Sequence, residues 1–508
     1  MSASPGPGGP APGLDALWSH QRQSGSRLYI GTGPDGLVFA GPQQGVLVLG
    51  PPRSGKTTTL VVPNVLAAAG PVIATSTKPE VMAATAAARS LNGGRCWLFD
   101  PAGTTPAPPG VTPIRWSPIT SCELWDEALL TARAMVGAAR PGPRPGDAGH
   151  WLERAEAVLS PLLHAAALGR RPMADVSAWV LRHDLDTAAH LLAGRGATMA
   201  ADVLAGLSAT HGRELSAIFS TTAGVLAAYR SASALAVADE VNFDPRHLAR
   251  SQDTVYLCAS AREQDLLAPI TVAFIEAARD GAYQAARDRP PSAPLTLVLD
   301  EATNIAPLPA LPSLVSEGGG QGVLTVVCLQ DLSQARERWG PAADGFGSLF
   351  GTKVVLPGIG ELATLELVSR LGGEIDVPSR SVSRTPWWAL RSPPTETWST
   401  QRQRRLPIDA VHHQPPQSAL VLRGASPPAR VGLRPWWDIE PFRRAPPAPV
   451  PTMAPGDPVP NPQRRHRAPG PACQEPEPGS GTPEVGFTLL GTDDGGRCGA
   501  RDYRAAPW

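Results

Sequence analysis

The sequence has 508 residues, 42% of them hydrophobic, which is enough to bury a large core and to form two or three domains. Its 45 lysines and arginines equal its 45 aspartates and glutamates, so any contact with nucleic acid must come from local patches or from an assembled pore. The six cysteines form no C-x-x-C pair and have no histidine at metal-ligand spacing. This pattern excludes a structural zinc site and indicates a reducing compartment.

The N-terminal residues 1–20 are rich in proline, glycine and alanine, a composition that predicts a disordered segment. They contain neither the charged start nor the apolar run of a signal peptide. The longest apolar runs, at 295–299 and 324–329, are strand-sized and much shorter than the roughly 20 residues that cross a bilayer. We therefore expect a cytoplasmic protein without a transmembrane segment, recruited to the inner face of the cell membrane by a partner.

Strand and helix signals alternate in the next part of the chain. The apolar run GVLVLG at 45–50 predicts a buried first strand, and PVIATST at 71–77 and RCWLFD at 95–100 predict two more. An alanine-rich helical pattern at 81–89 lies between the last two. This alternation predicts an α/β fold with a parallel central sheet, whose first part we place at residues 21–119.

From residue 120 to 239 the sequence changes character. Alanine, leucine and charged residues recur at helical spacing, as in WLERAEAVLSPLLHAAALG, and predict an all-helical inserted domain. Strand signals return at 254–260, 295–300, 323–330 and 352–358, so we place the second part of the α/β domain at 240–445. From 446 to 508 proline and glycine replace apolar residues, which predicts a disordered tail.

A phosphate-binding loop is predicted directly after the first strand. The segment GPPRSGKT fits G-x-x-x-x-G-K-[ST] and precedes a helix start. Its glycines allow backbone N–H groups to face the phosphates, Lys56 can reach the β- and γ-oxygens, and Thr57 can give its hydroxyl to Mg²⁺. The alternative is a chance glycine-rich turn, which the strand and helix context argues against. The predicted nucleotide-binding residues are Gly50, Pro51, Pro52, Arg53, Ser54, Gly55, Lys56, Thr57 and Thr58.

Polar residues end two later strands. Asp300 and Glu301 follow LTLVL, where Asp300 can hold Mg²⁺ through water and Glu301 can polarise an attacking water, so hydrolysis is favoured over phosphoryl transfer. Gln330 follows TVVCL and is predicted to sense the γ-phosphate. The alternatives are a solvated acidic strand end and a capping glutamine. We thus predict Lys56, Glu301 and Gln330 as catalytic residues, with Thr57 and Asp300 as metal ligands.

Together these motifs resemble the TraG/TraD-type coupling proteins of conjugative and type IV secretion systems, particularly actinobacterial members without a membrane segment. The resemblance runs from about residue 45 to 437. It includes GPPRSGKT, IATSTKPEV, LFDPAG, RWSPI, VVCLQDLSQARERWG and FGTKVVLPGI, and its most specific segment is DEATNIAPLPALPSLVSEGGGQG. One departure is Thr77, where an aspartate is common before the lysine, and another is the missing N-terminal membrane helices.

The resemblance implies a RecA-like motor domain, interrupted by an all-helical domain, that uses ATP and Mg²⁺ and assembles as a homo-hexamer around DNA. The implied function is an ATP-driven DNA translocase that delivers DNA to a secretion channel. The implied partners are DNA, relaxase or relaxosome proteins, and membrane-bound channel components. Two alternatives stay open, a coupling ATPase that recruits protein substrates and a nucleotide-gated scaffold.

Two further features stay undecided at the level of sequence. A ring motor needs an arginine that reaches the neighbouring subunit, and the candidates are Arg336, Arg338, Arg370 and Arg380. Residues 401–405, which read QRQRR, lie near Trp387, Trp388 and Trp398. They form either a patch for nucleic acid or a solvated face beside half-buried tryptophans.

Overall fold

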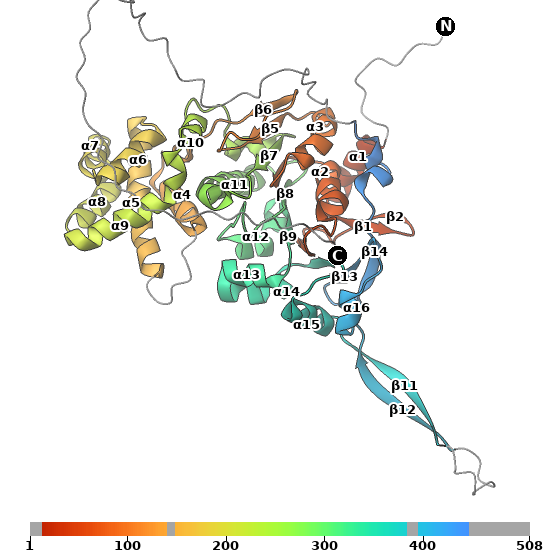
Figure 1. Cartoon of the computed structure of the whole chain (residues 1–508). Coiled ribbons are helices and arrows are strands. Elements are labelled where there is room, and N and C mark those ends of the chain that lie inside the picture. Colours follow the sequence, from red (N-terminus) through yellow and green to blue (C-terminus); the bar gives the residue numbers. More distant parts are fainter. Residues whose placement is uncertain (1–12, 140–147, 384–394, 447–508) are drawn as a thin grey trace, which may run out of the picture. The chain divides into compact units, whose positions relative to one another are not determined.

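The computed structural model describes residues 13–139, 148–383 and 395–446 (Figure 1). All of them belong to one compact unit, Met1–Pro451. The predicted tail from residue 447 onward and the tryptophans Trp387 and Trp388 lie outside the described residues.

A 12-stranded sheet runs through this unit in the order β2-β1-β14-β13-β10-β3-β9-β8-β4-β7-β5-β6. The strands from β10 to β6 are parallel, and the other four strands, β13, β14, β1 and β2, join them by antiparallel pairs. The predicted RecA-like α/β fold with a parallel central sheet is confirmed. The strands are β1 (Tyr29–Gly33), β2 (Gly36–Phe39), β3 (Val46–Leu49), β4 (Val72–Ser76), β5 (Cys96–Phe99), β6 (Val111–Pro113), β7 (Thr254–Cys258), β8 (Leu295–Leu299), β9 (Val323–Leu329), β10 (Thr352–Val355), β13 (Ser418–Arg423) and β14 (Ala429–Gly432).

The central strands are buried along their whole length because both faces of the sheet are covered. In β3, Leu47 and Leu49 join one hydrophobic cluster and Val46 and Val48 join the other, as alternation along a strand requires. The first cluster contains α11 (Gln264–Asp288) and the helical segment described next. The second contains α1 (Leu14–Ser24), α2 (Val62–Ala67) and α3 (Glu80–Leu91).

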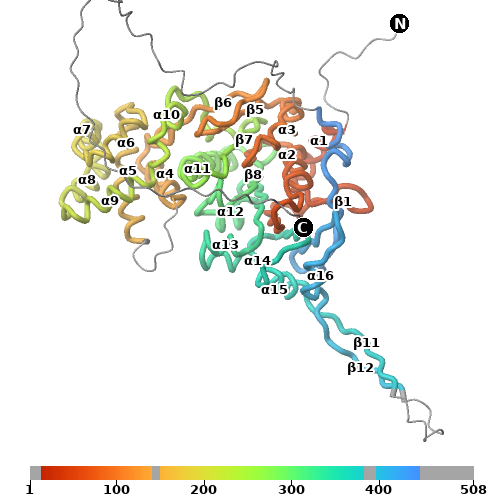
Figure 2. Tube along the Cα trace, viewed as in Figure 1, coloured from red at the N-terminus to blue at the C-terminus, as the bar shows by residue number. Residues whose placement is uncertain are grey.

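Between β6 and β7 the chain leaves the sheet, and its described residues form helices and no strand (Figure 2). They are η2 (Pro118–Ser121), α4 (Trp125–Ala138), α5 (Ala148–Gly169), α6 (Met173–Arg182), α7 (Asp186–Gly194), α8 (Thr198–Ser208), α9 (Gly212–Val225), η3 (Ala227–Arg230), α10 (Ala232–Val237) and η4 (Pro245–Arg250). The segments that lead into and out of this helical region run side by side. The Trp116 N–H donates to Val237 O at 2.8 Å, and the Asn242 N–H donates to Arg115 O at 3.0 Å.

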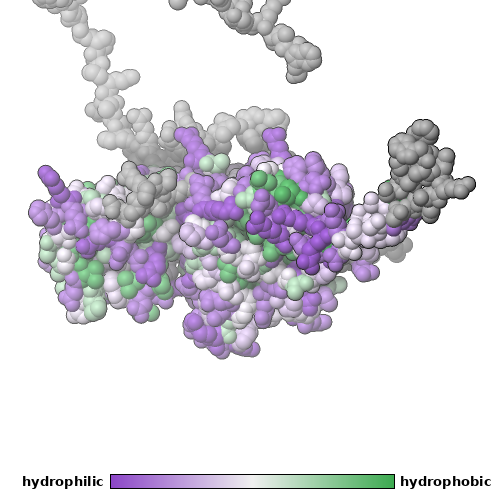
Figure 3. Space-filling model, turned by 90° about the horizontal axis from the view of Figure 1, so that it is seen from below, coloured by the Kyte–Doolittle hydropathy of each residue, from purple (hydrophilic) through white to green (hydrophobic). Residues whose placement is uncertain are grey.

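The remaining helices follow the strands of the second half. They are α12 (Leu311–Glu317), η5 (Gly318–Gln321), α13 (Leu332–Trp339), η6 (Gly340–Gly345), α14 (Phe346–Leu349), α15 (Leu362–Leu371), α16 (Ile408–His412), η7 (Trp436–Asp438) and η8 (Phe442–Arg444). Among the described helices, none has the length and apolar character needed to cross a bilayer. On the face shown in Figure 3, apolar areas are interrupted by hydrophilic side chains.

Helix α1 corrects the prediction that residues 1–20 are disordered, because it begins at Leu14. Leu14 and Trp18 are buried in the cluster that also contains α2. The indole N–H of Trp18 donates to Leu66 O at 2.7 Å. The helix is stabilised by this packing and not by its composition, which is why the proline-rich context misled the prediction.

Strands β11 (Glu374–Ser383) and β12 (Thr395–Arg404) form a separate two-stranded ribbon and pair only with each other among the described strands (Figure 1). The Arg402 guanidinium lies 3.5 Å from a Glu374 carboxylate oxygen, and Arg380 pairs with Glu396. Within the predicted basic patch, Arg402 is therefore paired with carboxylates of the same ribbon, whereas the Arg404 guanidinium donates to the Ser369 hydroxyl at 3.2 Å.

Candidate nucleotide-binding site

The phosphate-loop segment connects β3 to a π-helical turn, η1 (Thr57–Val61). Gly50 cannot carry a side chain, since an added Cβ would lie 2.9 Å from both Leu356 Cβ and Ser54 Oγ. Gly55 has φ 86°, a left-handed conformation that glycine adopts without strain. These two glycines allow the loop to turn back over the end of the strand.

Lys56 and Thr57 point into this turn. Lys56 is 8% exposed, and its ammonium donates to Gly50 O at 2.6 Å and to Pro51 O at 3.0 Å. The Thr57 hydroxyl donates to a carboxylate oxygen of Asp300 at 3.0 Å. Residues separated by 243 positions are thus in direct contact, because β3 and β8 both pair with β9 and end at the same edge of the sheet.

Asp300 is buried at the end of β8, where Thr75 donates its hydroxyl to the Asp300 backbone oxygen at 2.7 Å. Burial raises the pKa of the Asp300 carboxyl, and the Thr57 hydroxyl and the Lys56 ammonium oppose that rise. A buried carboxylate with a nearby cation and a hydroxyl donor is a suitable metal ligand.

Glu301 is half-buried and has φ 54°. A non-glycine residue in this left-handed region is uncommon, and such strain persists where the surrounding structure enforces it, often at functional sites. Burial and the neighbouring Asp300 carboxylate raise the pKa of Glu301. A carboxylate with a raised pKa is better matched to proton transfer near neutral pH.

Gln330 follows β9, which lies between β3 and β8 in the sheet. Its backbone position is fixed by Gln334, whose side-chain oxygen accepts the Gln330 N–H at 2.9 Å. The preceding Leu329 accepts the Gly50 N–H at 3.1 Å. The segment around Gln330 therefore adjoins the phosphate loop.

The loop retains polar groups that suit an anionic ligand. The Ser54 hydroxyl is buried and has no hydrogen-bond partner among the described residues, and Lys56 is satisfied only by carbonyls of its own loop. No cluster of three or more His, Cys, Asp or Glu in the described part of the chain could hold a metal ion. A cation here would take Thr57 and Asp300 together with oxygens of a bound phosphate and water, which is how Mg²⁺ is bound with nucleotides.

Sequence reasoning missed two residues that position this site, Thr75 and Gln334. Both act on backbone atoms from other elements, and no motif marks them. One arginine proposed to reach another subunit is used within the chain, since Arg338 donates to Gly137 O at 2.9 Å, Ala138 O at 3.0 Å and Pro307 O at 3.2 Å. Arg338 therefore ties the C-terminal end of α4 to the segment that follows Glu301.

A phosphate loop that contacts an Asp-Glu pair at the same edge of a parallel sheet defines a P-loop nucleoside triphosphatase of the RecA-like class. A family model described as Type IV secretory system Conjugative DNA transfer matches residues 17–444. The chain belongs to this family, which confirms the predicted resemblance to the TraG/TraD-type coupling proteins.

Solved structures of the bacterial conjugative coupling protein TrwBdeltaN70 share the fold. The unbound monoclinic form is 16% identical over 82% of this chain and 91% of that chain, with a TM-score of 0.61. The trigonal form with sulphate is 17% identical over 82% and 92%, with a TM-score of 0.60. TrwB in complex with ADP and Mg²⁺ is 17% identical over 80% and 88%, with a TM-score of 0.59. No protein of curated function matches the sequence.

Proposed function

We propose that this chain binds ATP with Mg²⁺ at the phosphate loop and hydrolyses it to move DNA toward a type IV secretion channel. The observation that carries the proposal is the Thr57–Asp300 hydrogen bond of 3.0 Å, because it joins the two halves of the site. Family membership and the TrwB complex with ADP and Mg²⁺ support the choice of ligand.

Each residue has a separate task in the proposed reaction. The Lys56 ammonium exchanges its loop carbonyls for β- and γ-phosphate oxygens, and Thr57 and Asp300 hold the magnesium, Asp300 through water. Glu301 orients the attacking water and accepts its proton. Bound Mg²⁺ supplies charge neutralisation at the phosphates. Gln330 lies at the end of β9, between β3 and β8. It responds to the loss of the γ-phosphate and transmits the resulting conformational change along β9.

We further propose that the protein acts as a homo-hexameric ring, with DNA in its pore and relaxosome proteins and membrane-bound channel components as partners. With a net charge of +0, the proposed DNA contacts come from local patches or from the assembled pore and not from a basic exterior. The protein is proposed to work in the cytoplasm, recruited to the inner face of the membrane by the channel.

The test is steady-state ATP hydrolysis by the purified full chain, alone and with single- or double-stranded DNA. Glu301→Gln should lower turnover by roughly 10²- to 10⁴-fold, and Lys56→Ala should abolish nucleotide binding. Lys78→Ala is the matched control, because Lys78 is exposed and pairs only with Glu80 at 3.6 Å among its charged neighbours.

The outcomes separate the proposed motor from its alternatives. Stimulation by one form of DNA, lost in Lys56→Ala, supports a DNA motor and identifies its substrate. An ATP hydrolysis rate that neither form of DNA changes points instead to recruitment of protein substrates or to a nucleotide-gated scaffold. Unchanged hydrolysis in Glu301→Gln would refute the assignment of the general base.

A further inference from the structure

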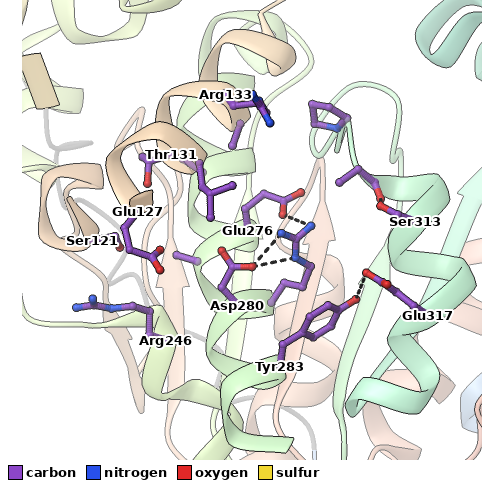
Figure 4. Close-up of a pocket in the computed structure, with 17 residues that line it drawn as sticks. Ser121, Glu127, Thr131, Arg133, Arg246, Glu276, Asp280, Tyr283, Ser313 and Glu317 are labelled. Carbon is purple, nitrogen blue, oxygen red and sulfur yellow. Dashed lines mark hydrogen bonds and ion pairs between the residues drawn. The ribbon is translucent and has the colours of Figure 1, made fainter. Parts of the chain in front are cut away.

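A cavity of about 310 Å³ lies where the helical segment meets the sheet domain (Figure 4). Its walls come from α4, α11 and α12, with Ser121 of η2 and Arg246 of η4 at one side. None of its lining residues belongs to the phosphate site. The volume is in the range of pockets that bind small molecules.

Charged side chains dominate the polar part of the lining. The carboxylates are Glu127, Glu276, Asp280 and Glu317, and the cations are Arg133, Arg246 and Arg279. These groups come from four separate elements, so the chain brings them together only by folding. A count of the lining residues alone leaves a small excess of negative charge.

Two of the three arginines form ion pairs with acids outside the cavity. Arg133 Nε lies 3.1 Å from a Glu156 carboxylate oxygen, and Arg246 Nη2 lies 2.8 Å from an Asp244 carboxylate oxygen. Neither of these acids lines the cavity. Arg279, together with Arg246 whose charge is shared between Asp244 and Glu127, therefore has to balance four carboxylates in the lining.

The Arg279 guanidinium already forms ion pairs with two of these carboxylates. Its Nη1 lies 2.5 Å from Glu276 and its Nη2 lies 2.9 Å from Asp280, and the guanidinium stands over the Tyr283 ring at 5.6 Å. Glu127 has no ion-pair partner among the described residues. Burial, and next the charge of Asp280, raise the pKa of Glu127, and the charge of Arg246 opposes that rise, as expected where carboxylates outnumber the cations beside them.

A second observation concerns Ser121, next to Glu127 in the cavity wall (Figure 4). Ser121 is 5% exposed, and its hydroxyl has no hydrogen-bond partner among the described residues. Buried hydroxyls in folded proteins are normally paired, and one without a partner is a position where a ligand can supply the missing bond. The hydroxyl lies on the same side of the cavity as the Glu127 carboxylate, which forms no ion pair among the described residues.

We propose that this cavity binds an organic cation with a primary ammonium or guanidinium group. Glu127 and Asp280 supply the counter-charge, and the Ser121 hydroxyl accepts one hydrogen bond from the cation. The cation can be a free aliphatic polyamine or a lysine or arginine side chain of a partner protein, since both present the same charged group. An occupant would contact α4, α11 and α12 together, and α12 follows the segment that Arg338 links to α4.

The experiment is isothermal titration calorimetry of the full chain with two probes in separate arms. One probe is spermidine, and the other is the capped tripeptide Gly-Lys-Gly. Both are titrated at moderate ionic strength, which suppresses contacts with exposed carboxylates. Binding of spermidine alone identifies a free polyamine, and binding of the tripeptide alone identifies a side chain of a partner.

Glu127→Gln and Ser121→Ala test the site directly, and Glu153→Gln is the matched control because Glu153 is exposed on α5 and lies outside the cavity. Glu127→Gln should weaken binding by roughly tenfold or more, since it removes a charge-assisted hydrogen bond, and Ser121→Ala should weaken it less. Glu153→Gln should bind like the wild type. The proposal is overturned if neither probe binds saturably, or if Glu127→Gln binds as tightly as the wild type while its thermal unfolding is unchanged. This readout does not depend on ATP hydrolysis, so its failure leaves the proposed function untouched.

Discussion

Thr57→Ala tests whether the contact between the two halves of the site is functional. The substitution removes the hydroxyl that donates to the buried Asp300 carboxylate at 3.0 Å. A hydrogen bond to a charged group contributes about 1.5–3 kcal/mol, and every 1.4 kcal/mol is a factor of ten. We therefore expect the Mg²⁺ concentration for half-maximal ATP hydrolysis to rise roughly 10- to 100-fold.

The same substitution should also change the pH dependence. The Thr57 hydroxyl lowers the pKa of Asp300 against the effect of burial, so its loss raises that pKa further. More of the carboxyl is then protonated as pH falls, and hydrolysis should be lost at a higher pH than in the wild type.

Hydrolysis rates measured against Mg²⁺ concentration at several pH values report both effects. Thr57→Ser is the control, because it keeps the hydroxyl and should remain close to the wild type. If Thr57→Ala keeps the wild-type Mg²⁺ dependence, Thr57 and Asp300 do not form the metal site, and the reasoning from their contact fails.

Two predictions concern stability and are read from chemical denaturation. Trp18→Ala should lower the free energy of unfolding by about 3–5 kcal/mol, because it empties a buried position. Trp18→Phe should lower it by about 1–3 kcal/mol, because Leu66 O loses its hydrogen-bond donor. A change within ~0.5 kcal/mol for both variants would mean that α1 is not part of the folded core. Gly281→Ala should destabilise by about 1–3 kcal/mol, since its Cβ would lie 2.1 Å from Arg246 O. Gly206→Ala, with nothing within 4 Å of its Cβ, should instead stabilise by up to ~1 kcal/mol, and equal effects at the two glycines would contradict the close packing of α11 against η4.

The phosphate-loop motif could be predicted from sequence because its residues are contiguous. Gly50, Gly55, Lys56 and Thr57 are positioned by the turn itself, and the apolar run before them marks the strand that it follows. Asp300, Glu301 and Gln330 are likewise marked by the strands that they end. The contact between Thr57 and Asp300 could be anticipated only in general terms, because it depends on which strands neighbour one another.

The antiparallel strands of the sheet were not predicted. Strand β14 joins β1 through the pairing of Thr32 with Gly432, and neither segment has a long apolar run. Their place is set by a contact between residues that are 400 positions apart. Helix α1 was missed for a related reason, since the burial of Trp18 depends on α2 and not on its own neighbours.

By itself the sequence determined the α/β class, the phosphate loop and the acidic pair, because each is encoded in residues close along the chain. Only the tertiary structure decided that Arg338 links α4 to the segment after Glu301, and that Glu127 faces Asp280 with too few cations nearby. The physical reason is that the charge state and partners of a side chain are set by groups from distant segments. A local sequence pattern indicates which helix or strand a residue belongs to, and folding determines which side chains and backbone groups that residue contacts.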